Sequence, residues 1–295
     1  MSTPEDTNSR DETVGALIAE AEQCLRDAGI ESPRREARLL LAHQLGLEAA
    51  SMRLRDAQAP VSGTDAQAFR AHVARRTGHQ PLAHITGMRG FWSLDLAVSD
   101  ATLIPRADSE AVITCLLALR PDHARRLRML DLGTGTGCLL LAALSEYPQG
   151  WGIGIDLSPQ ACALAAANAQ STGLDARSAF LCGSWSDALS SGASFDLVLS
   201  NPPYIRSADI MGLMPEVARF EPATALDGGV DGLDAYRTIL ARMAGLLAPD
   251  GIAILELGAG QFDDVQAIVV AQGLALVSVQ ADLQGIIRAM ALRRT

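Results

Sequence analysis

From Leu127 to the C-terminus, short apolar runs alternate with longer segments that carry apolar residues at helical spacing. A short apolar run fits a buried strand, whereas a longer segment with this spacing fits an amphipathic helix. Strands that alternate with helices form a mostly parallel sheet that is covered on both faces. The sequence therefore predicts a doubly wound α/β domain, which binds ligands beyond the carboxyl ends of its strands. The last two apolar runs, residues 274–280 and 286–294, are close enough to form an antiparallel hairpin.

The first 80 residues or so contain helical patterns only. One amphipathic segment ends at Gly29, where glycine is a typical helix stop. Thr64 and Gln67 form a capping-box pattern at the start of another helix, which ends at Gly78. Short amphipathic helices cannot bury their apolar faces alone, so we expect these helices to pack into a small bundle.

A change of pattern near Gly87 to Gly90 marks the expected domain boundary. Beyond it, apolar and polar residues alternate, which is typical of a half-buried strand or hairpin, and we expect a connecting hairpin at residues 89–106. In the larger domain we also expect one helix at residues 232–251, ended by a glycine. The expected disordered tail, helical domain and larger domain cover residues 1–12, 13–88 and 89–295.

Every one of the 24 basic residues is arginine, so the chain has no lysine. Without lysine no side chain can form a Schiff base, and no P-loop can supply its phosphate-binding lysine. Residues 1–128 contain 16 arginines and 17 acidic residues, whereas residues 129–295 contain 8 arginines and 17 acidic residues. Because nucleic-acid binding depends on neutralising phosphates, the acidic second part argues against a DNA substrate. A local basic groove would still allow one.

The five cysteines are scattered, and no C-x-x-C or H-x-x-x-H pair occurs. We therefore expect no metal site, no disulfide framework and a reducing, cytoplasmic location. No apolar stretch reaches the roughly 20 residues of a membrane helix, so we expect no membrane partner. The polar, acidic N-terminus is unlike a secretory signal. We also expect a monomer.

A glycine-rich loop, LDLGTGTG, places Gly133, Gly135 and Gly137 between a strand and a helix. Glycine allows positive φ and lets a ligand approach the backbone closely. A dinucleotide-binding G-x-G-x-x-G pattern would need glycine in place of Cys138 or Leu140, so that pattern fails. The remaining D-x-G-x-G-x-G pattern resembles the first motif of S-adenosylmethionine-dependent methyltransferases.

An acidic residue, Asp156, ends the second strand of this region, 19 residues after Gly137. A carboxylate at this position can accept hydrogen bonds from both ribose hydroxyls of a nucleoside. Its other interpretation is a helix cap, because Ser158-Pro159 begins a helix. Asp131 either anchors the glycine loop or lies near the methionine end of the cofactor.

The stretch Asn201-Pro202-Pro203-Tyr204 follows a strand and cannot extend the sheet, because proline lacks an N–H and has a fixed φ. We interpret it as a site of methyl transfer to a planar amino nitrogen, whose delocalised lone pair is a poor nucleophile. The side-chain oxygen of Asn201 and the carbonyl of Pro202 can each accept one N–H, which points the lone pair at the methyl donor. The aromatic ring of Tyr204 offers a flat surface against the target group. The alternative is a structural turn after a buried strand.

Four stretches carry a resemblance to one family: QPLAHITGMRGFW, IPRADSEAVI, NPPYI and FEPATALDGGVDGLDAYRTI. In this order they resemble the protein-(glutamine-N5) methyltransferases (PrmC, also called HemK), which modify peptide chain release factors. The resemblance covers nearly the whole chain. It implies the class I S-adenosylmethionine-dependent methyltransferase fold, with a Rossmann-like, seven-stranded sheet. It also implies a small all-helical N-terminal domain that recognises the protein substrate.

The resemblance assigns roles to individual positions. S-adenosylmethionine would be bound by Asp131, Gly133, Thr134, Gly135, Thr136, Gly137, Asp156, Trp185 and Asn201. The target glutamine would be held by Asn201, Pro202, Pro203 and Tyr204, and the catalytic residues would be Asn201, Pro202 and Tyr204.

Three further positions have open roles. Trp185 would pack against the adenine or else be an ordinary core tryptophan. Arg106 would belong to the loop near the cofactor or form a salt bridge with Glu110. Glu221 and the proline after it are expected to shape the substrate cleft.

The resulting expectation is N5-methylation of the glutamine in the Gly-Gly-Gln motif of release factors, which leaves S-adenosylhomocysteine. The alternative is a nucleic-acid methyltransferase acting on adenine or cytosine, where base flipping would bring the base against Tyr204. A non-catalytic adaptor is a third possibility, and the presence of Asn201 and the loop glycines argues against it. The chain departs from the family pattern at His84, at Ser184 and in the terminal stretch DLQGIIRAM, outside the proposed chemistry.

Overall fold

The computed structural model describes residues 12–187, 189, 192, 194–282 and 284–295. The chain forms two compact units, one up to Gly87 and one from Met88 onward. Residues 1–11 of the expected tail lie outside the described residues. In the part of the chain that is described, no helix has the length and apolar character needed to cross a membrane.

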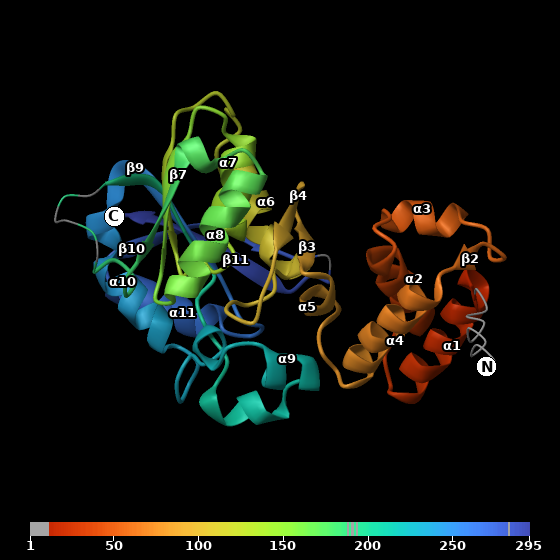
Figure 1. Ribbon diagram of the computed structural model, residues 1–295. Coiled ribbons are helices and arrows are strands. Elements are labelled where there is room, and N and C mark those ends of the chain that lie inside the picture. The colour runs from red at the N-terminus through yellow and green to blue at the C-terminus, as the bar shows by residue number, and fades with distance from the viewer. Residues whose placement is uncertain (1–11, 188, 190–191, 193, 283) are drawn as a thin grey trace, which may run out of the picture. The chain divides into compact units, whose positions relative to one another are not determined.

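The first unit consists mainly of helices around an apolar core (Figure 1). Its helices are α1 (Val14–Asp27), α2 (Pro33–Gln44), α3 (Ala49–Leu54), α4 (Gly63–Thr77) and α5 (Leu82–Thr86). Leu17, Leu25, Leu40, Leu41 and Phe69 are fully buried between them. The apolar faces that the sequence predicted are thus buried against one another.

Two short strands correct the expectation that the first unit contains helices only. β1 (Glu12–Thr13) pairs in antiparallel fashion with β2 (Pro60–Val61). Beside this pair, the backbone amide of Val14 donates to the carbonyl of Ala59 at 3.0 Å. A helix start leaves its first amide groups without partners inside the helix. The strand pair therefore brings an acceptor to the start of α1, which the helical pattern alone did not predict.

The start of α4 lies two residues before the predicted capping box. Ser62 is the N-cap: its Oγ accepts from the backbone amide of Asp65 at 3.1 Å and donates to Asp65 Oδ2 at 2.7 Å. The prediction of Thr64 and Gln67 was wrong because Ser62 has extended backbone and Gly63 already begins the helix. Ser62 and Asp65 thus cap the helix two residues before the predicted position, and Asp65 accepts the Ser62 hydroxyl where a capping box would have its side chain accept the backbone amide of the N-cap.

We expect Ser62→Ala to lower the free energy of unfolding by about 1 kcal/mol, because the amide of Asp65 loses its acceptor. Thr64→Ala is the matched control, since Thr64 lies inside α4 and does not cap it. It should change the stability by no more than a few tenths of a kcal/mol. Chemical unfolding followed by circular dichroism measures both. A larger loss of stability in Thr64→Ala than in Ser62→Ala would support Thr64 as the N-cap instead.

The second unit confirms the predicted seven-stranded, mostly parallel sheet (Figure 1). The strand order is β10-β11-β9-β8-β5-β6-β7, in which β11 runs antiparallel to both of its neighbours, β10 and β9. The antiparallel hairpin of β10 and β11 is also as predicted. The strands are β5 (Arg128–Leu132), β6 (Trp151–Asp156), β7 (Ser178–Cys182), β8 (Phe195–Ser200), β9 (Leu247–Glu256), β10 (Leu274–Ala281) and β11 (Ile287–Arg294).

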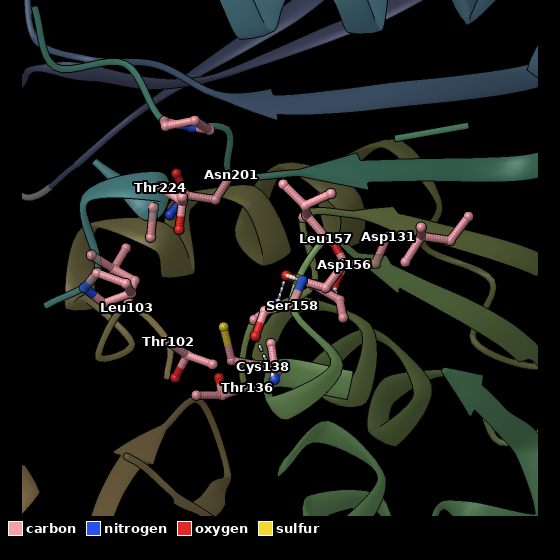
Figure 2. Close-up of a pocket in the computed structure, with 18 of the residues that line it drawn as sticks. Thr102, Leu103, Asp131, Thr136, Cys138, Asp156, Leu157, Ser158, Asn201 and Thr224 are labelled. Atoms are coloured by element: carbon pink, nitrogen blue, oxygen red, sulfur yellow. Dashed lines mark hydrogen bonds between the residues drawn. The ribbon is translucent and has the colours of Figure 1, made fainter. Parts of the chain in front are cut away.

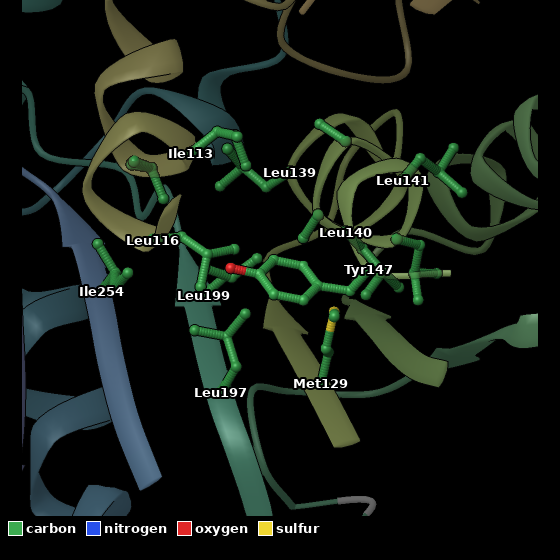
Figure 3. Close-up of a cluster of buried hydrophobic side chains, with 14 of the residues drawn as sticks. Ile113, Leu116, Met129, Leu139, Leu140, Leu141, Tyr147, Leu197, Leu199 and Ile254 are labelled. Atoms are coloured by element: carbon green, nitrogen blue, oxygen red, sulfur yellow. The ribbon is translucent and has the colours of Figure 1, made fainter. Parts of the chain in front are cut away.

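Helices cover both faces of this sheet, and alternate strand residues face opposite sides. Leu197 and Leu199 of β8 pack with α6 and α7 in one cluster (Figure 3), whereas Val198 packs with α10 and α11 in the other. The remaining elements of the unit include the hairpin β3 (Met88–Phe91) and β4 (Leu94–Ala97) and the helices α6 (Glu110–Leu119), α7 (Cys138–Glu146), α8 (Pro159–Ser171), α9 (Pro215–Phe220), α10 (Asp234–Leu246) and α11 (Phe262–Ala271). The 3₁₀ helices are η1 (Ala107–Ser109), η2 (Asp175–Arg177), η3 (Ser207–Gly212) and η4 (Ala223–Ala225).

The expected helix at residues 232–251 ends earlier than predicted. α10 stops at Leu246 and β9 begins at once with Leu247, so Gly251 lies in a strand and is not a helix stop. A Cβ atom on Gly251 would lie 2.6 Å from the carbonyl oxygen of Phe195 in β8. Glycine is therefore required here for the close approach of two strands, a reason that a helical pattern does not reveal.

Candidate active site

Three loops meet beyond the carboxyl ends of β6, β5 and β8, which are neighbours in the sheet. Gly133 follows β5, Asp156 ends β6 and Asn201 follows β8. Together with segments around Thr102 and Thr224 they line a cavity of about 370 Å³ (Figure 2). The cavity thus lies where doubly wound proteins bind their ligands.

The glycine loop has the backbone conformation that its sequence predicted. Gly133, Gly135 and Gly137 have φ angles of 73°, 54° and 82°, all in the left-handed region that favours glycine. The backbone amides of Gly133 and Thr134 both donate to the carbonyl of Ile155, at 2.9 and 3.0 Å. The loop is therefore held against the end of β6 with no side chain on its glycines to obstruct a ligand.

Asp156 ties this loop to β6. Its Oδ2 accepts from the backbone amide of Gly135 at 2.8 Å, and its Oδ1 accepts from the amide of Ser158 at 2.9 Å. The cap of α8 is Ser158, whose Oγ accepts from the amide of Ala161 at 3.2 Å. The helix-cap interpretation therefore applies to Ser158. Both oxygens of Asp156 keep further lone pairs that can accept ribose hydroxyls.

Asp131 anchors the loop from the other side. Its Oδ2 accepts the hydroxyl of Thr134 at 2.7 Å, while its Oδ1 has no hydrogen-bond partner in the described part of the chain. Burial raises the pKa of Asp131 to about 7, and the Thr134 hydroxyl lowers it in part. The anchoring role is observed, and a contact with the methionine end of the cofactor stays a prediction.

Unpaired polar atoms near the cavity test whether S-adenosylmethionine fits it. Besides Asp131 Oδ1, the hydroxyls of Thr102 and Thr136 are buried without a partner among the described residues, and all three residues line the cavity. Buried polar atoms nearly always have partners. A ligand with polar groups at this end, such as the ammonium and carboxylate of S-adenosylmethionine, would supply them. The residues present therefore fit this cofactor.

Trp185 combines the two roles that its sequence left open. It lines the cavity beside the glycine loop, where a Cβ on Gly133 would lie 3.4 Å from the ring atom Cζ3 of Trp185. It also packs against buried residues of the core on the α10 side. Its φ of 47° is rare for a residue with a side chain, and such strain persists only where the surroundings hold it. Adenine stacking on this ring stays a prediction.

Asn201 lines the cavity, and its amide is held at the nitrogen end. Its Nδ2 donates to the hydroxyl oxygen of Ser109 at 3.2 Å. Ser109 is buried and lies in η1, 92 residues earlier in the chain. Because the nitrogen is engaged with Ser109, the amide oxygen is the atom left to accept an N–H from a ligand.

The other three residues of the motif differ in whether they line the cavity. Pro203 lines the cavity, but Pro202 and Tyr204 are not among the lining residues. The Tyr204 hydroxyl donates to Oε1 of the buried Glu256 at 3.3 Å. The structure therefore brings Asn201 and Pro203 to the cavity, whereas the Tyr204 hydroxyl is engaged with β9.

Arg106 and Glu221, whose roles the sequence left open, form an ion pair with each other. Arg106 Nη2 lies 2.5 Å from Glu221 Oε1, so the alternative salt bridge with Glu110 was wrong. Glu110 instead accepts the backbone amide of Trp92 at 3.0 Å. Burial raises the pKa of Glu221, and Arg106 lowers it. Arg106 lines the cavity, so this pair joins the loop before α6 to the segment before η4.

Three functional side chains escaped the sequence analysis: Thr102, Ser109 and Glu256. Thr102 belongs to no pattern with a known chemistry, and Ser109 lies in the stretch IPRADSEAVI, whose resemblance gave this serine no role of its own. Glu256 ends an apolar strand, and a buried acid in such a run was the one available signal. The partners of Ser109 and Glu256, which are Asn201 and Tyr204, lie far away in the chain, so no local pattern could assign these contacts.

Comparisons with known proteins agree with this arrangement. The profile of the PrmC N-terminal domain matches residues 16–87, and that of a methyltransferase domain matches residues 123–259. A release factor glutamine methyltransferase of Rhodospirillum rubrum is 45% identical over 281 residues, which cover 95% of this chain and 85% of that protein. One of Bradyrhizobium diazoefficiens is 42% identical over 275 residues, which cover 92% and 91%.

Among solved structures, the hMettl16 catalytic domain in complex with MAT2A 3'UTR hairpin 6 is similar with a TM-score of 0.57. It is 15% identical in sequence, and the match covers 72% of this chain and 80% of that chain. A likeness at this identity supports the class I methyltransferase fold alone.

We expect Gly135→Ala to weaken S-adenosylmethionine binding at least tenfold, or by about 1.4 kcal/mol. A side chain at positive φ costs roughly 1–2 kcal/mol and pushes the amide of residue 135 away from Asp156. Gly173→Ala is the matched control, because Gly173 has φ of 70° and open space around its Cβ position, far from the cavity lining. It should lose similar stability and keep its affinity. Titration calorimetry measures the affinity of both variants for S-adenosylmethionine. Equal affinities in the two variants would contradict the assignment of the glycine loop to cofactor binding.

Proposed function

The chain belongs to the family of release factor glutamine methyltransferases, and from this premise we propose that it methylates a glutamine side chain of peptide chain release factors. The proposed target is the amide nitrogen, N5, of the glutamine in the Gly-Gly-Gln motif. The observation that carries the proposal is the Asn201 amide, whose nitrogen is bonded to Ser109 and whose oxygen is left for the cavity.

An amide nitrogen is a poor nucleophile because its lone pair is delocalised into the carbonyl group. The Asn201 oxygen and the Pro202 carbonyl would each accept one N–H of the target, which pyramidalises the nitrogen and aims its lone pair. Such catalysis depends on fixed dipoles and alignment, so it needs no general base to begin. The methylated nitrogen then loses one proton to solvent, which restores a neutral amide.

Bound S-adenosylmethionine supplies an electrophilic methyl group, and the sulfur keeps the bonding electron pair when S-adenosylhomocysteine is left. The glycine loop and Asp156 would hold the nucleoside part, and Asp131, Thr102 and Thr136 would surround the amino-acid part. These residues would position the cofactor and exclude water from the cavity. The Arg106–Glu221 pair would hold part of the cavity wall in place without entering the chemistry.

We further propose that the helical unit recognises the release factor. Support comes from the match of the PrmC N-terminal domain to residues 16–87. Within residues 12–87 nine arginines stand against nine acidic residues, a balance that suits a protein surface better than a polyphosphate. The acidic second part of the chain likewise disfavours the alternative of a nucleic-acid substrate.

We expect Asn201→Ala to lower the rate of methyl transfer to a release factor by about 100-fold or more, because one fixed acceptor is lost. Transfer from labelled S-adenosylmethionine is measured side by side on release factor and on unmethylated duplex DNA. Label should appear on the release factor, map to the Gly-Gly-Gln glutamine, and be absent when that glutamine is replaced by glutamate. Label on DNA alone would establish the nucleic-acid alternative instead.

The control variant for this experiment is Ser207→Ala. Ser207 follows the same motif and loses one hydrogen bond, to Asp227 at 2.7 Å, but it does not line the cavity. Its rate should stay within about twofold of the wild type, since a surface hydrogen bond contributes little. Circular dichroism, measured separately, shows that Asn201→Ala is folded.

A further inference from the structure

Glu256, the last residue of β9, places a buried carboxyl group beside the proposed site. The residue is 1% exposed and is not among those that line the cavity. Its Oε1 accepts the Tyr204 hydroxyl at 3.3 Å, while its Oε2 has no hydrogen-bond partner in the described part of the chain. A buried carboxyl group that is only half paired is costly. Its position between strand end and motif therefore requires an explanation.

Ser109 is the hydrogen-bond partner of Asn201 and belongs to a segment packed near this carboxyl group. The Asn201 amide donates to the Ser109 oxygen, so the Ser109 hydroxyl must donate its own hydrogen elsewhere. Burial raises the pKa of Glu256 to about 7, and the Ser109 and Tyr204 hydroxyls lower it. Asp108, the residue before Ser109, pairs with Arg288 at 2.8 Å, and the carbonyl of Arg288 accepts from the amide of Leu257, the residue after Glu256, at 2.8 Å. These contacts bring Ser109 near the Glu256 carboxyl group, whose open acceptor is Oε2.

We propose that Glu256 is a positioning residue that sets, through Ser109, which end of the Asn201 amide faces the cavity. The carboxylate accepts the Ser109 hydrogen, which turns the Ser109 lone pair toward the Asn201 nitrogen. The Asn201 oxygen is then the end that points away from Ser109 and toward the target. This inference rests on the proposed function and deepens it, because it assigns the control of the acceptor.

Protonation of Glu256 reverses the chain of hydrogen bonds. A neutral carboxyl group donates to Ser109, and Ser109 then donates to Asn201. This requires the Asn201 amide to turn over, with its oxygen toward Ser109 and its NH₂ group toward the cavity. Two NH₂ groups, that of Asn201 and that of the target glutamine, would then face each other without an acceptor between them. Methyl transfer is therefore expected from the charged form alone.

Other groups packed around Glu256 set the charge that it feels. Arg288 of β11 lowers its pKa, and Asp108 of η1, which pairs with Arg288 at 2.8 Å, raises it. Tyr236 of α10 donates to the main-chain oxygen of Glu256 at 2.8 Å and not to the carboxylate. Burial is the main cause that raises the pKa of the Cys138 thiol, and the charge of Glu256 raises it further. None of these contacts involves the side chain of Asn201, whose amide is bonded to Ser109.

The first experiment reads the amide directly and needs no substrate. The side-chain NH₂ signals of Asn201, identified by their absence in Asn201→Ala, are followed by nitrogen–proton NMR between pH 5.5 and pH 8.5, a range that brackets the pKa of Glu256 at about 7. In wild type they should shift with a midpoint near that pKa. In Glu256→Gln and in Ser109→Ala the shift should vanish, because the titrating group or the relay is missing.

The second experiment measures kcat on release factor across the same pH range with saturating S-adenosylmethionine. The wild-type rate should fall about tenfold for each pH unit below the pKa of Glu256. Glu256→Gln should lower kcat at least tenfold and remove this pH dependence, while it binds S-adenosylmethionine normally. Ser109→Ala, whose side chain lines the cavity, should show the same losses in kcat and in pH dependence. Tyr236→Phe is the matched control: it loses one fully buried hydroxyl beside Glu256 and should keep the pH dependence.

The outcomes separate this inference from the proposed function. If no protein is methylated, the proposed function fails, and the NMR titration still decides the coupling of Glu256 to Asn201. An Asn201 signal that titrates equally in Glu256→Gln overturns the inference. So does a pH dependence that survives in that variant, which would then belong to Asp131, whose pKa is also raised to about 7. Ser109→Ala serves as the second test if Glu256→Gln does not fold.

Discussion

The parallel pairing of β5 with β6 on one side and with β8 on the other determines where every loop of the site begins. Leu132 lies opposite Ile155 and also opposite Ser200, so the chain leaves all three strands at one level. The Ser200 hydroxyl donates to the carbonyl of Leu132 at 2.7 Å across that level. A register slip would turn the apolar side chains away from both helical layers. The loop positions are therefore fixed by the core before any ligand binds.

Acidic side chains then hold the loops in place through hydrogen bonds at their bases. Four carboxyl groups do this, each on a different segment: Asp131 with Thr134, Asp156 with Gly135, Glu221 with Arg106 and Glu256 with Tyr204. Burial raises the pKa of Asp131 and of Glu256 to about 7, above the ordinary values. These two groups therefore lower the stability of the fold as the pH rises from ordinary carboxyl pKa values toward 7, since the unfolded chain releases their protons first. The site thus contains ionisable groups that change state near neutral pH.

The sequence predicts features that depend on local patterns better than it predicts contacts between residues that are distant in the chain. The glycine loop and the sheet follow from patterns within a few residues, and the structure has both. The partners of Asn201 and Arg106 lie 92 and 115 residues away, so no spacing rule could name Ser109 or Glu221. The error at the end of α10 has the same origin, because Gly251 allows β9 to approach β8 closely. The cap error is local, since Ser62 bonds to Asp65 within one turn. Tertiary packing overrode local propensity at the end of α10.

The proposed reaction explains why so acidic a chain can work without a base or a lysine. S-adenosylmethionine carries a positive sulfonium, which a negatively charged domain attracts, whereas phosphate groups are repelled. The target amide is neutral and needs acceptors in fixed directions more than it needs charge. An asparagine side chain presents an acceptor at one end and a donor at the other, in nearly the same shape. Whether Asn201 helps or obstructs an incoming NH₂ group thus depends on the hydrogen bond to Ser109 at 3.2 Å, and on what orients that hydroxyl.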